Sequence, residues 1–289
     1  MADEDRIGLI AETSSGPVEY LDNGRGDAVL FVHGSPGGCD EGELMTRFVV
    51  AAGYRVIAPS RPGYLATPLT DDNASPDQQA ELHLALLDSL GIKHCALMFW
   101  SGGGPSSYRL ATQHAHRVSR LVAIAAVSKA YKFAGGVDGA LLEGRIGHWL
   151  VKEMAKHSPK TLVKSTVGEE GDLDKQQLKR LVEEIWEDDT KRDFVLSLAE
   201  IVAGRKTGLE NDRQQFPKIE DLGLAGIQQP VLLVHGTVDA DVPPVYSDFA
   251  QSQLPNADRY AIEGGTHISV WAGPDADGAQ ERIVEFLNA

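Results

Sequence analysis

The feature that most constrains the fold is a repeated pattern in which a short apolar run leads directly into a loop with glycine or proline. Continuous apolar runs of this length are typical of strands that are buried on both faces of a parallel sheet. Segments with helix signals alternate with these runs. The alternation predicts an α/β fold in which a mainly parallel β-sheet is flanked by helices. The apolar runs lie at residues 28–32, 55–58, 95–100, 121–127 and 230–234.

Helix signals stand between these runs. Ser75 is a suitable N-cap, Pro76 suits a first helical turn, and Gly91 is a suitable C-terminal stop. We expect further strands at residues 7–13, 18–22 and 259–262. We expect helices at residues 43–52, 76–90, 106–114, 245–253 and 276–287.

The pattern changes between residues 128 and 226, where no buried strand is evident. Two amphipathic helical stretches, at residues 141–156 and 175–203, dominate this segment. We predict a helical cap at residues 128–226, inserted into a core made of residues 1–127 and 227–289. The alternative is that these stretches are long crossover helices of the sheet.

The charge balance limits the classes of partner. The chain has 42 acidic and 27 basic side chains and a formal net charge of −15. Because no basic surplus exists to neutralise phosphates, we expect neither a nucleic-acid nor a membrane partner. The expected partner is a small-molecule substrate, and the sequence leaves a homodimer open.

The cysteines and the N-terminus bear on the cellular compartment. Cys39 and Cys95 lie in no Cys-x-x-Cys pattern, so we expect free thiols without a disulfide. The N-terminus is acidic and has no apolar segment typical of a secretory signal. A cytoplasmic protein is the default expectation. No cluster of histidine, cysteine and carboxylate at metal-ligand spacing is evident, so we expect neither a metal nor an organic cofactor.

The run at residues 95–100 ends in a lone serine, Ser101, which is followed at once by Gly102, Gly103 and Gly104. A strand, a sharp turn and a helix in this order can hold a serine hydroxyl exposed at the apex. The N–H of Gly102 and the helix N-terminus favour negative charge beside that hydroxyl. Glycine-rich turns of nucleotide-binding units have a similar sequence. Residues elsewhere in the chain are therefore needed to distinguish a nucleophilic serine from a nucleotide-binding turn.

Ser35, Asp239 and His267 lie in three other loops that follow predicted strands. Because the carboxyl ends of parallel strands meet at one edge of a sheet, these residues and Ser101 are expected to lie together. A serine hydroxyl needs a base to take its proton, and the base needs an acid to orient it. The four residues together can therefore form a nucleophilic site.

The first of these loops offers backbone donors to an anion. Pro36 has no N–H, so a donor must come from Ser35 or Gly37, and we favour Ser35. His33 precedes this loop and is interpreted as a structural histidine.

The order of serine, aspartate and histidine and their contexts resemble those of the α/β-hydrolase family. The resemblance covers nearly the whole chain and implies an inserted cap at the position of the helical segment. It implies Ser101 as nucleophile, Asp239 as acid and His267 as base, with the N–H groups of Ser35 and Gly102 as the oxyanion hole. The motifs are residues 33–38, 99–103, 235–243 and 264–267.

Two details qualify the resemblance. Asp241 is an alternative acid, but Asp239 has the family position. The family usually has a small residue two positions before the nucleophile, where this chain has Phe99, so this ring needs space beside the turn.

The function implied by the resemblance is acyl transfer by a serine hydrolase, and ester hydrolysis through an acyl-enzyme is our first choice. The oxyanion loop also resembles that of proline iminopeptidases. C–C bond hydrolysis and a non-catalytic small-ligand receptor stay open. Trp100, Trp149 and Trp271 are predicted to line an apolar substrate pocket. A peptidase would need acids to hold a free amine, for which the segment offers Glu143, Glu169 and Glu170.

Overall fold

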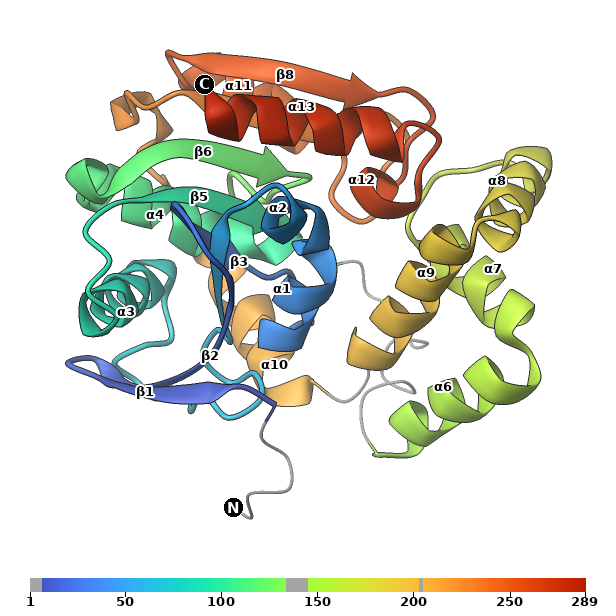
Figure 1. Cartoon of the computed structure of the whole chain (residues 1–289), viewed down its shortest axis with the longest axis horizontal. Coiled ribbons are helices and arrows are strands. Elements are labelled where there is room, and N and C mark those ends of the chain that lie inside the picture. Colours follow the sequence, from blue (N-terminus) through green and yellow to red (C-terminus); the bar gives the residue numbers. More distant parts are fainter. Residues whose placement is uncertain (1–6, 134–144, 203–204) are drawn as a thin grey trace.

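An eight-stranded sheet forms the centre of the computed structural model, which describes residues 7–133, 145–202 and 205–289 (Figure 1). The strand order is β1-β2-β4-β3-β5-β6-β7-β8. β1 pairs antiparallel with β2, and β2 pairs antiparallel with β4, whereas all pairs from β4 to β8 are parallel. The mainly parallel sheet predicted from the apolar runs is thereby confirmed. The strands are β1 (Leu9–Thr13), β2 (Gly16–Gly24), β3 (Ala28–Val32), β4 (Arg55–Pro59), β5 (Cys95–Trp100), β6 (Val118–Ile124), β7 (Val231–Gly236) and β8 (Ala257–Ile262).

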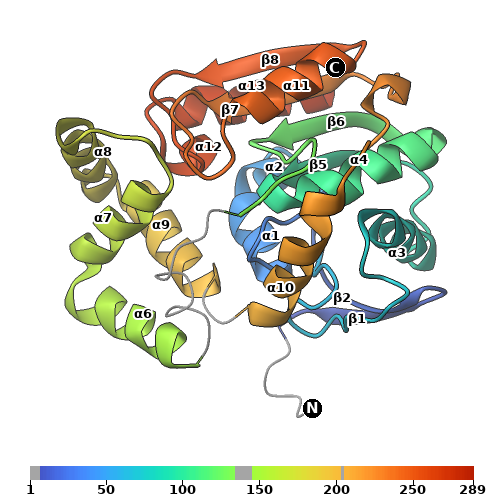
Figure 2. The ribbon, with the colours of Figure 1, turned by 180° about the vertical axis from the view of Figure 1, so that it is seen from behind.

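Helices cover both faces of the sheet (Figures 1 and 2). Because successive side chains of a strand point to opposite faces of the sheet, each buried strand contributes side chains to two hydrophobic cores, one on each face. Phe31 and Met98 pack with the helices of one face, and Leu30 and Leu97 pack with those of the other. The first face carries α1 (Cys39–Met45), α2 (Arg47–Ala51), α12 (Ser269–Ala272) and α13 (Ala276–Asn288), and the second carries α3 (Pro76–Ser89), α4 (Gly104–Gln113) and α11 (Val245–Gln253).

Between β6 and β7 the described part of the chain contains helices and loops but no strand of the sheet. Four of them form a lobe beside the sheet: α6 (Arg145–His157), α7 (Pro159–Glu169), α8 (Lys175–Glu187) and α9 (Asp189–Val202). Helix α9 packs against α1 and α12 of the core. Phe194 of α9 stacks on Trp271 of α12, with ring centroids 5.6 Å apart. The lobe is thus anchored on one side of the sheet's carboxyl edge.

Helix α10 (Lys206–Gln215) lies beside the sheet domain (Figure 2). A side chain on Gly208 would meet the ring of Tyr64 at 2.3–2.5 Å, so helix and ring are in direct contact. Asn211 donates a hydrogen bond to the carbonyl of Ala74. Helix α10 thus packs on the core although it lies within residues 128–226, and the boundaries of the cap stay a prediction.

Two predicted helices are each divided in the structure. The stretch at residues 175–203 breaks at Asp188, whose backbone is extended and whose carboxylate caps α9 by accepting the N–H groups of Thr190 and Lys191. The helix expected at residues 43–52 begins at Cys39 and is interrupted at Thr46. Local capping by a short polar side chain, which amphipathic periodicity does not reveal, explains the first break. Among the described residues, no helix is long and apolar enough to cross a membrane.

Candidate active site

Ser101 lies at the apex of the turn between β5 and α4. Its φ is 51°, in the left-handed region that a non-glycine residue rarely adopts. The turn also brings backbones close together. A Cβ on Gly103 would lie 2.3 Å from the carbonyl oxygen of Val32, and one on Gly104 would lie 2.3 Å from that of Val127. Glycine is therefore required at both positions by close approach, as expected for a strained turn that exposes a nucleophile.

His267 and Asp239 form a buried pair. Nδ1 of His267 lies 2.7 Å from Oδ2 of Asp239, and each side chain is at most 1% exposed. The other carboxylate oxygen, Oδ1, accepts the N–H groups of Asp241 and Val242. These bonds fix the carboxylate, which in turn places a proton of His267 on Nδ1 and leaves Nε2 as the nitrogen that can gain or lose a proton.

The electrostatic environment favours a charged imidazole. Burial alone would lower the pKa of His267, but the charge and hydrogen bond of Asp239, with smaller contributions from Asp241 and Glu170, raise it to about 10. Burial would raise the pKa of Asp239, but His267 and His235 outweigh burial and lower it. The site therefore stabilises the imidazolium form, which a histidine base adopts once it has received a proton.

The loop after β3 lies directly against Ser101. A Cβ on Gly34 would meet the Trp100 ring at 2.6 Å and Cβ of Ser101 at 3.2 Å, and one on Gly102 would meet Oγ of Ser35 at 2.0 Å. In the described part of the chain, the N–H groups of Ser35 and Gly102 donate to no protein acceptor. The two predicted oxyanion donors therefore lie on either side of Ser101.

A buried ion pair holds this loop from behind. Arg61 and Asp212 are each 1% exposed in their side chains and form two hydrogen bonds of 2.8 Å. Arg61 also donates to the carbonyl of Gly34 and to Oγ of Ser35, and Ser35 donates to Asp212 at 2.6 Å. Tyr64 donates a further bond to Asp212. The network links helix α10 to the loop that carries Ser35. Asp212 could not be identified from the local sequence, because its partners Arg61 and Ser35 lie far away along the chain.

A second buried pair lies below the same loop. His33 accepts the N–H of Arg61 at Nε2, so its proton is on Nδ1, which donates to the carbonyl of Gly34. Nδ1 also lies 3.8 Å from Glu41, whose two carboxylate oxygens are buried and have no hydrogen-bond partner among the described residues. His33 thus has bonded nitrogens and a structural role, in agreement with its interpretation from the sequence.

The three predicted pocket tryptophans differ in their surroundings. The Trp100 ring lies 4.8 Å from the His267 ring, and its Nε1 donates to the His267 carbonyl. Trp271 packs edge-on against Trp100, and its Nε1 donates to the carbonyl of Met45. The side chain of Trp149 lies outside the described part of the structure, as does the whole of Glu143. The pocket-lining roles stay predictions.

Phe99 finds its space in the opposite core. Its ring is fully buried and contacts Tyr108 of α4 edge-on, with centroids 5.0 Å apart. Because neighbouring strand residues face opposite sides, Phe99 points away from the face that Trp100 occupies. The bulky ring is therefore compatible with the positive φ of Ser101.

Two further carboxylates lie beside His267. Oδ2 of Asp241 is 3.3 Å from Nε2 of His267, and the Glu170 carboxylate belongs to the same cluster, in which the ligand atoms lie within 4.8 Å of one another. Burial raises the pKa of Glu170 to about 8, against the opposing effect of His267. Sequence reasoning named Asp241 as an alternative acid and Glu170 as a possible anchor for an amine, but it did not place the two together at Nε2 of His267. Nε2 of His267 has no hydrogen-bond partner among the described residues, Ser101 included.

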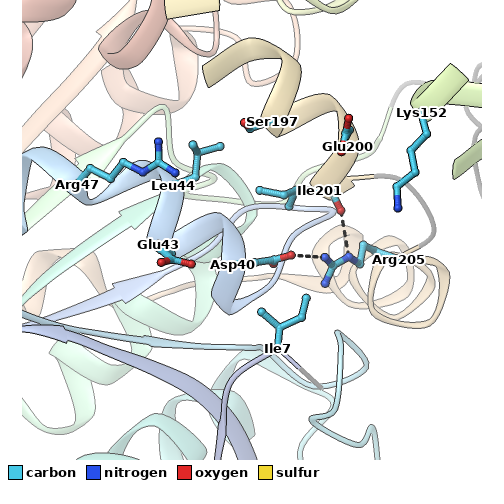
Figure 3. Close-up of a pocket in the computed structure, with 10 residues that line it drawn as sticks. All are labelled: Ile7, Asp40, Glu43, Leu44, Arg47, Lys152, Ser197, Glu200, Ile201 and Arg205. Carbon is cyan, nitrogen blue, oxygen red and sulfur yellow. Dashed lines mark hydrogen bonds and ion pairs between the residues drawn. The ribbon is translucent and has the colours of Figure 1, made fainter. Parts of the chain in front are cut away.

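A separate cavity of about 470 Å³ opens between α1 of the core and α6 and α9 of the lobe (Figure 3). Arg205 points into it, donating to Asp40 at 2.5 Å and to the carbonyl of Ile201 at 3.0 Å. Arg47, Lys152, Glu43 and Glu200 also line it, so both signs of charge are present. Ser101 and His267 do not line this cavity, which separates it from the site described above.

Comparisons with known proteins agree with this architecture. Residues 27–274 match the model of the alpha/beta hydrolase fold family. An alpha/beta hydrolase fold protein from Nakamurella multipartita is 43% identical in sequence, with a TM-score of 0.93 over 96% of this chain and 98% of that one. The uncharacterized hydrolase YcgS of Bacillus subtilis is 25% identical over 95% of this chain and 96% of its own length. A 2-hydroxy-6-oxononadienedioate/2-hydroxy-6-oxononatrienedioate hydrolase of Pseudomonas putida is 27% identical over 93% of this chain and 91% of its own length. With a sheet, an apical serine and a buried Asp–His pair in the matching order, this chain belongs to the alpha/beta hydrolase fold family.

Proposed function

We propose that this protein is a serine hydrolase that cleaves a carboxylic ester of a small, largely apolar substrate through an acyl-enzyme intermediate. The observation that carries the proposal is the left-handed backbone of Ser101, at φ 51°, between two unengaged N–H groups. A hydroxyl in that position can attack a carbonyl carbon while the N–H groups receive the oxyanion.

Each group has a defined task in the proposed reaction. Oγ of Ser101 attacks the carbonyl carbon as Nε2 of His267 takes its proton, and Asp239 stabilises the resulting imidazolium. The N–H groups of Ser35 and Gly102 hold the negative oxygen of the tetrahedral adduct. His267 then gives its proton to the leaving alcohol. A water molecule, deprotonated in the same way, releases the acid and regenerates Ser101.

Before the reaction, Nε2 must move into hydrogen-bond distance of Ser101. Catalytic hydrogen bonds are often long or poorly aligned in free enzymes and tighten when substrate binds.

The aromatic side chains near Gly102 support the proposal that the acyl group of the substrate is apolar. Phe216 lies 3.3 Å from the position of a Cβ on Gly102, and Phe133 stacks on it with centroids 5.8 Å apart.

A second candidate is hydrolysis of a C–C bond beside a ketone, which the relative from Pseudomonas putida supports by its name. That name describes a dioate, a substrate with two carboxylates. In this chain, the carboxylates of Asp239 and Asp241 lie beside His267, and Arg61 is already paired with Asp212. Like charges disfavour binding of a dianion, so we favour a neutral ester.

The test is covalent labelling with a fluorophosphonate probe, followed by mapping of the modified peptide. We expect labelling at Ser101, and hydrolysis of p-nitrophenyl esters of graded chain length. Ser101→Ala should abolish both, with a loss of several orders of magnitude in kcat. A matched control is Ser107→Ala in α4, since that hydroxyl is buried and has no partner among the described residues.

Absence of labelling in the folded protein would argue for a non-catalytic receptor. Labelling without ester turnover, combined with turnover of a vinylogous dioate, would favour the C–C bond hydrolase.

A further inference from the structure

Nε2 of His267 is a buried nitrogen that faces two carboxylates, and it lies 3.3 Å from Oδ2 of one of them, Asp241. The His267 side chain is 1% exposed, and Nε2 makes no hydrogen bond within the described residues. Oε2 of Glu170 is likewise buried without a partner. Asp241 completes the cluster from the solvent side, with 42% of its side chain exposed. A nitrogen and two carboxylates therefore converge on one point, and neither Nε2 of His267 nor Oε2 of Glu170 has a hydrogen-bond partner there among the described residues.

The spacing of these atoms suits a metal ion. Zinc binds histidine nitrogen and carboxylate oxygen at about 2.0–2.2 Å, so neighbouring ligands of a tetrahedral ion are about 3.3–3.6 Å apart. Nε2 of His267 and Oδ2 of Asp241 are 3.3 Å apart. The donor atoms of His267, Asp241 and Glu170 all lie within 4.8 Å of one another, and rotation of the long Glu170 side chain can close the remaining gap.

The surroundings also provide the supporting contacts that metal ligands require. A metal-bound histidine usually donates its other ring N–H to a carboxylate, and Nδ1 of His267 does so to Asp239. The Asp241 carboxylate is oriented by Tyr131, whose hydroxyl lies 3.3 Å from Oδ1 and donates to the backbone carbonyl at 2.9 Å. The backbone carbonyl of Glu170 accepts the N–H of His267 at 3.0 Å, which fixes the two segments relative to each other.

We propose that Glu170, Asp241 and Nε2 of His267 form an inhibitory site for Zn²⁺. An imidazole ligand favours zinc over magnesium or calcium, which prefer oxygen alone. Zinc displaces the protons that Nε2 of His267 and Glu170 hold near neutral pH and releases them to solvent. Two carboxylates and a neutral imidazole then supply three ligands, and water takes the fourth position.

Zinc at this site would block the base. The ion occupies the lone pair of Nε2 that has to accept the proton of Ser101, so the nucleophile cannot be activated. This consequence rests on the proposed function, whereas zinc binding itself does not. Glu170 comes from the segment that follows α7 of the lobe, so the site also links the lobe to the loops of Asp239 and His267.

The first experiment measures binding directly. Full-length protein without a histidine tag is titrated with ZnCl₂ by isothermal calorimetry, in parallel with MgCl₂. We expect one zinc per chain and no comparable magnesium binding. Glu170→Gln and Asp241→Asn should each weaken zinc binding by at least about tenfold, since loss of even an outer partner costs about 10–100-fold. The control is Glu169→Gln, an exposed neighbour outside the cluster, which should bind zinc as the parent does.

The second experiment measures the rate of fluorophosphonate labelling at Ser101. Zinc should slow labelling of the parent and EDTA should restore it, while Glu170→Gln should need at least about tenfold more zinc for the same effect. Equal zinc affinity in all variants, or no binding of one ion per chain, would overturn the site. Zinc binding that leaves labelling unchanged would overturn the inhibition. If zinc binds as expected but the zinc-free protein is not labelled, the proposed hydrolase function fails and the metal site stands.

Discussion

Glu41 offers a sharp test of the electrostatic reasoning. Its carboxyl group is fully buried in α1, and neither oxygen has a hydrogen-bond partner among the described residues. Burial raises the pKa of Glu41 well above its usual range. The change Glu41→Gln keeps the shape and removes the titration. We expect the variant to gain stability relative to the parent as the pH rises.

The sign and size follow from proton linkage. In the unfolded chain Glu41 loses its proton near pH 4.3, whereas in the native state it keeps the proton to a higher pH. Between these two pKa values the native state binds the extra proton, so the free energy of unfolding falls as the pH rises. The slope is about 1.4 kcal/mol per pH unit, or about 2 kcal/mol over the first 1.5 units above pH 4.3. A glutamine at position 41 removes this loss.

The assay is urea unfolding of both proteins at intervals from pH 4 to pH 7. The measured quantity is the difference between their free energies of unfolding, which should grow with pH in favour of Glu41→Gln. The control is Glu43→Gln in the same helix, because Glu43 is exposed and should give a flat difference. A flat difference for Glu41→Gln as well would mean that Glu41 is ionised at little cost in the native state, and the reasoning would be wrong.

Three further predictions concern the surroundings of the site. Asp212→Ala leaves Arg61 buried without its partner and should cost about 3–5 kcal/mol in the free energy of unfolding, measured in urea; a loss below 1 kcal/mol would contradict the role of the pair. Cys39 and Cys95 are buried, and burial raises the pKa of each thiol to about 12. Ellman's reagent should therefore modify them only after unfolding, and rapid modification of the native protein would refute this prediction. Gly104→Ala places a Cβ 2.3 Å from the backbone carbonyl oxygen of Val127 and should slow fluorophosphonate labelling or lower the free energy of unfolding. A variant with the stability and labelling rate of the parent would show that the turn is less tightly packed than described.

The sheet was predictable because its signal is local. Each buried strand is a continuous apolar run, and each run leads into a loop, so the strand order along the chain and the position of Ser101 could be inferred. The pairing of Asp239 with His267 followed from the order of the loops and a family resemblance. Helix breaks such as the one at Asp188 were missed, because a capping carboxylate leaves the apolar periodicity almost unchanged.

The long-range polar contacts could not be predicted. Arg61 and Asp212 pair across 151 positions of the chain, and neither residue carries a local signal for its partner. Glu170 and Asp241 were visible as acids, but only the fold brings them to Nε2 of His267. Buried polar networks depend on tertiary geometry, which hydrophobic patterning does not specify.

The attachment of α10 to the oxyanion loop has a consequence for protein engineering. A helical lobe is an obvious segment to exchange between related enzymes in order to change their substrates. In this chain, Asp212 lies after the lobe in sequence but bonds to Arg61 and Ser35 of the core. A chimera joined near residue 226 would bring in a foreign partner for Arg61 and disturb the loop beside Ser101. A junction placed before α10 keeps Asp212 with its own core, so the lobe can be exchanged without displacing Ser35.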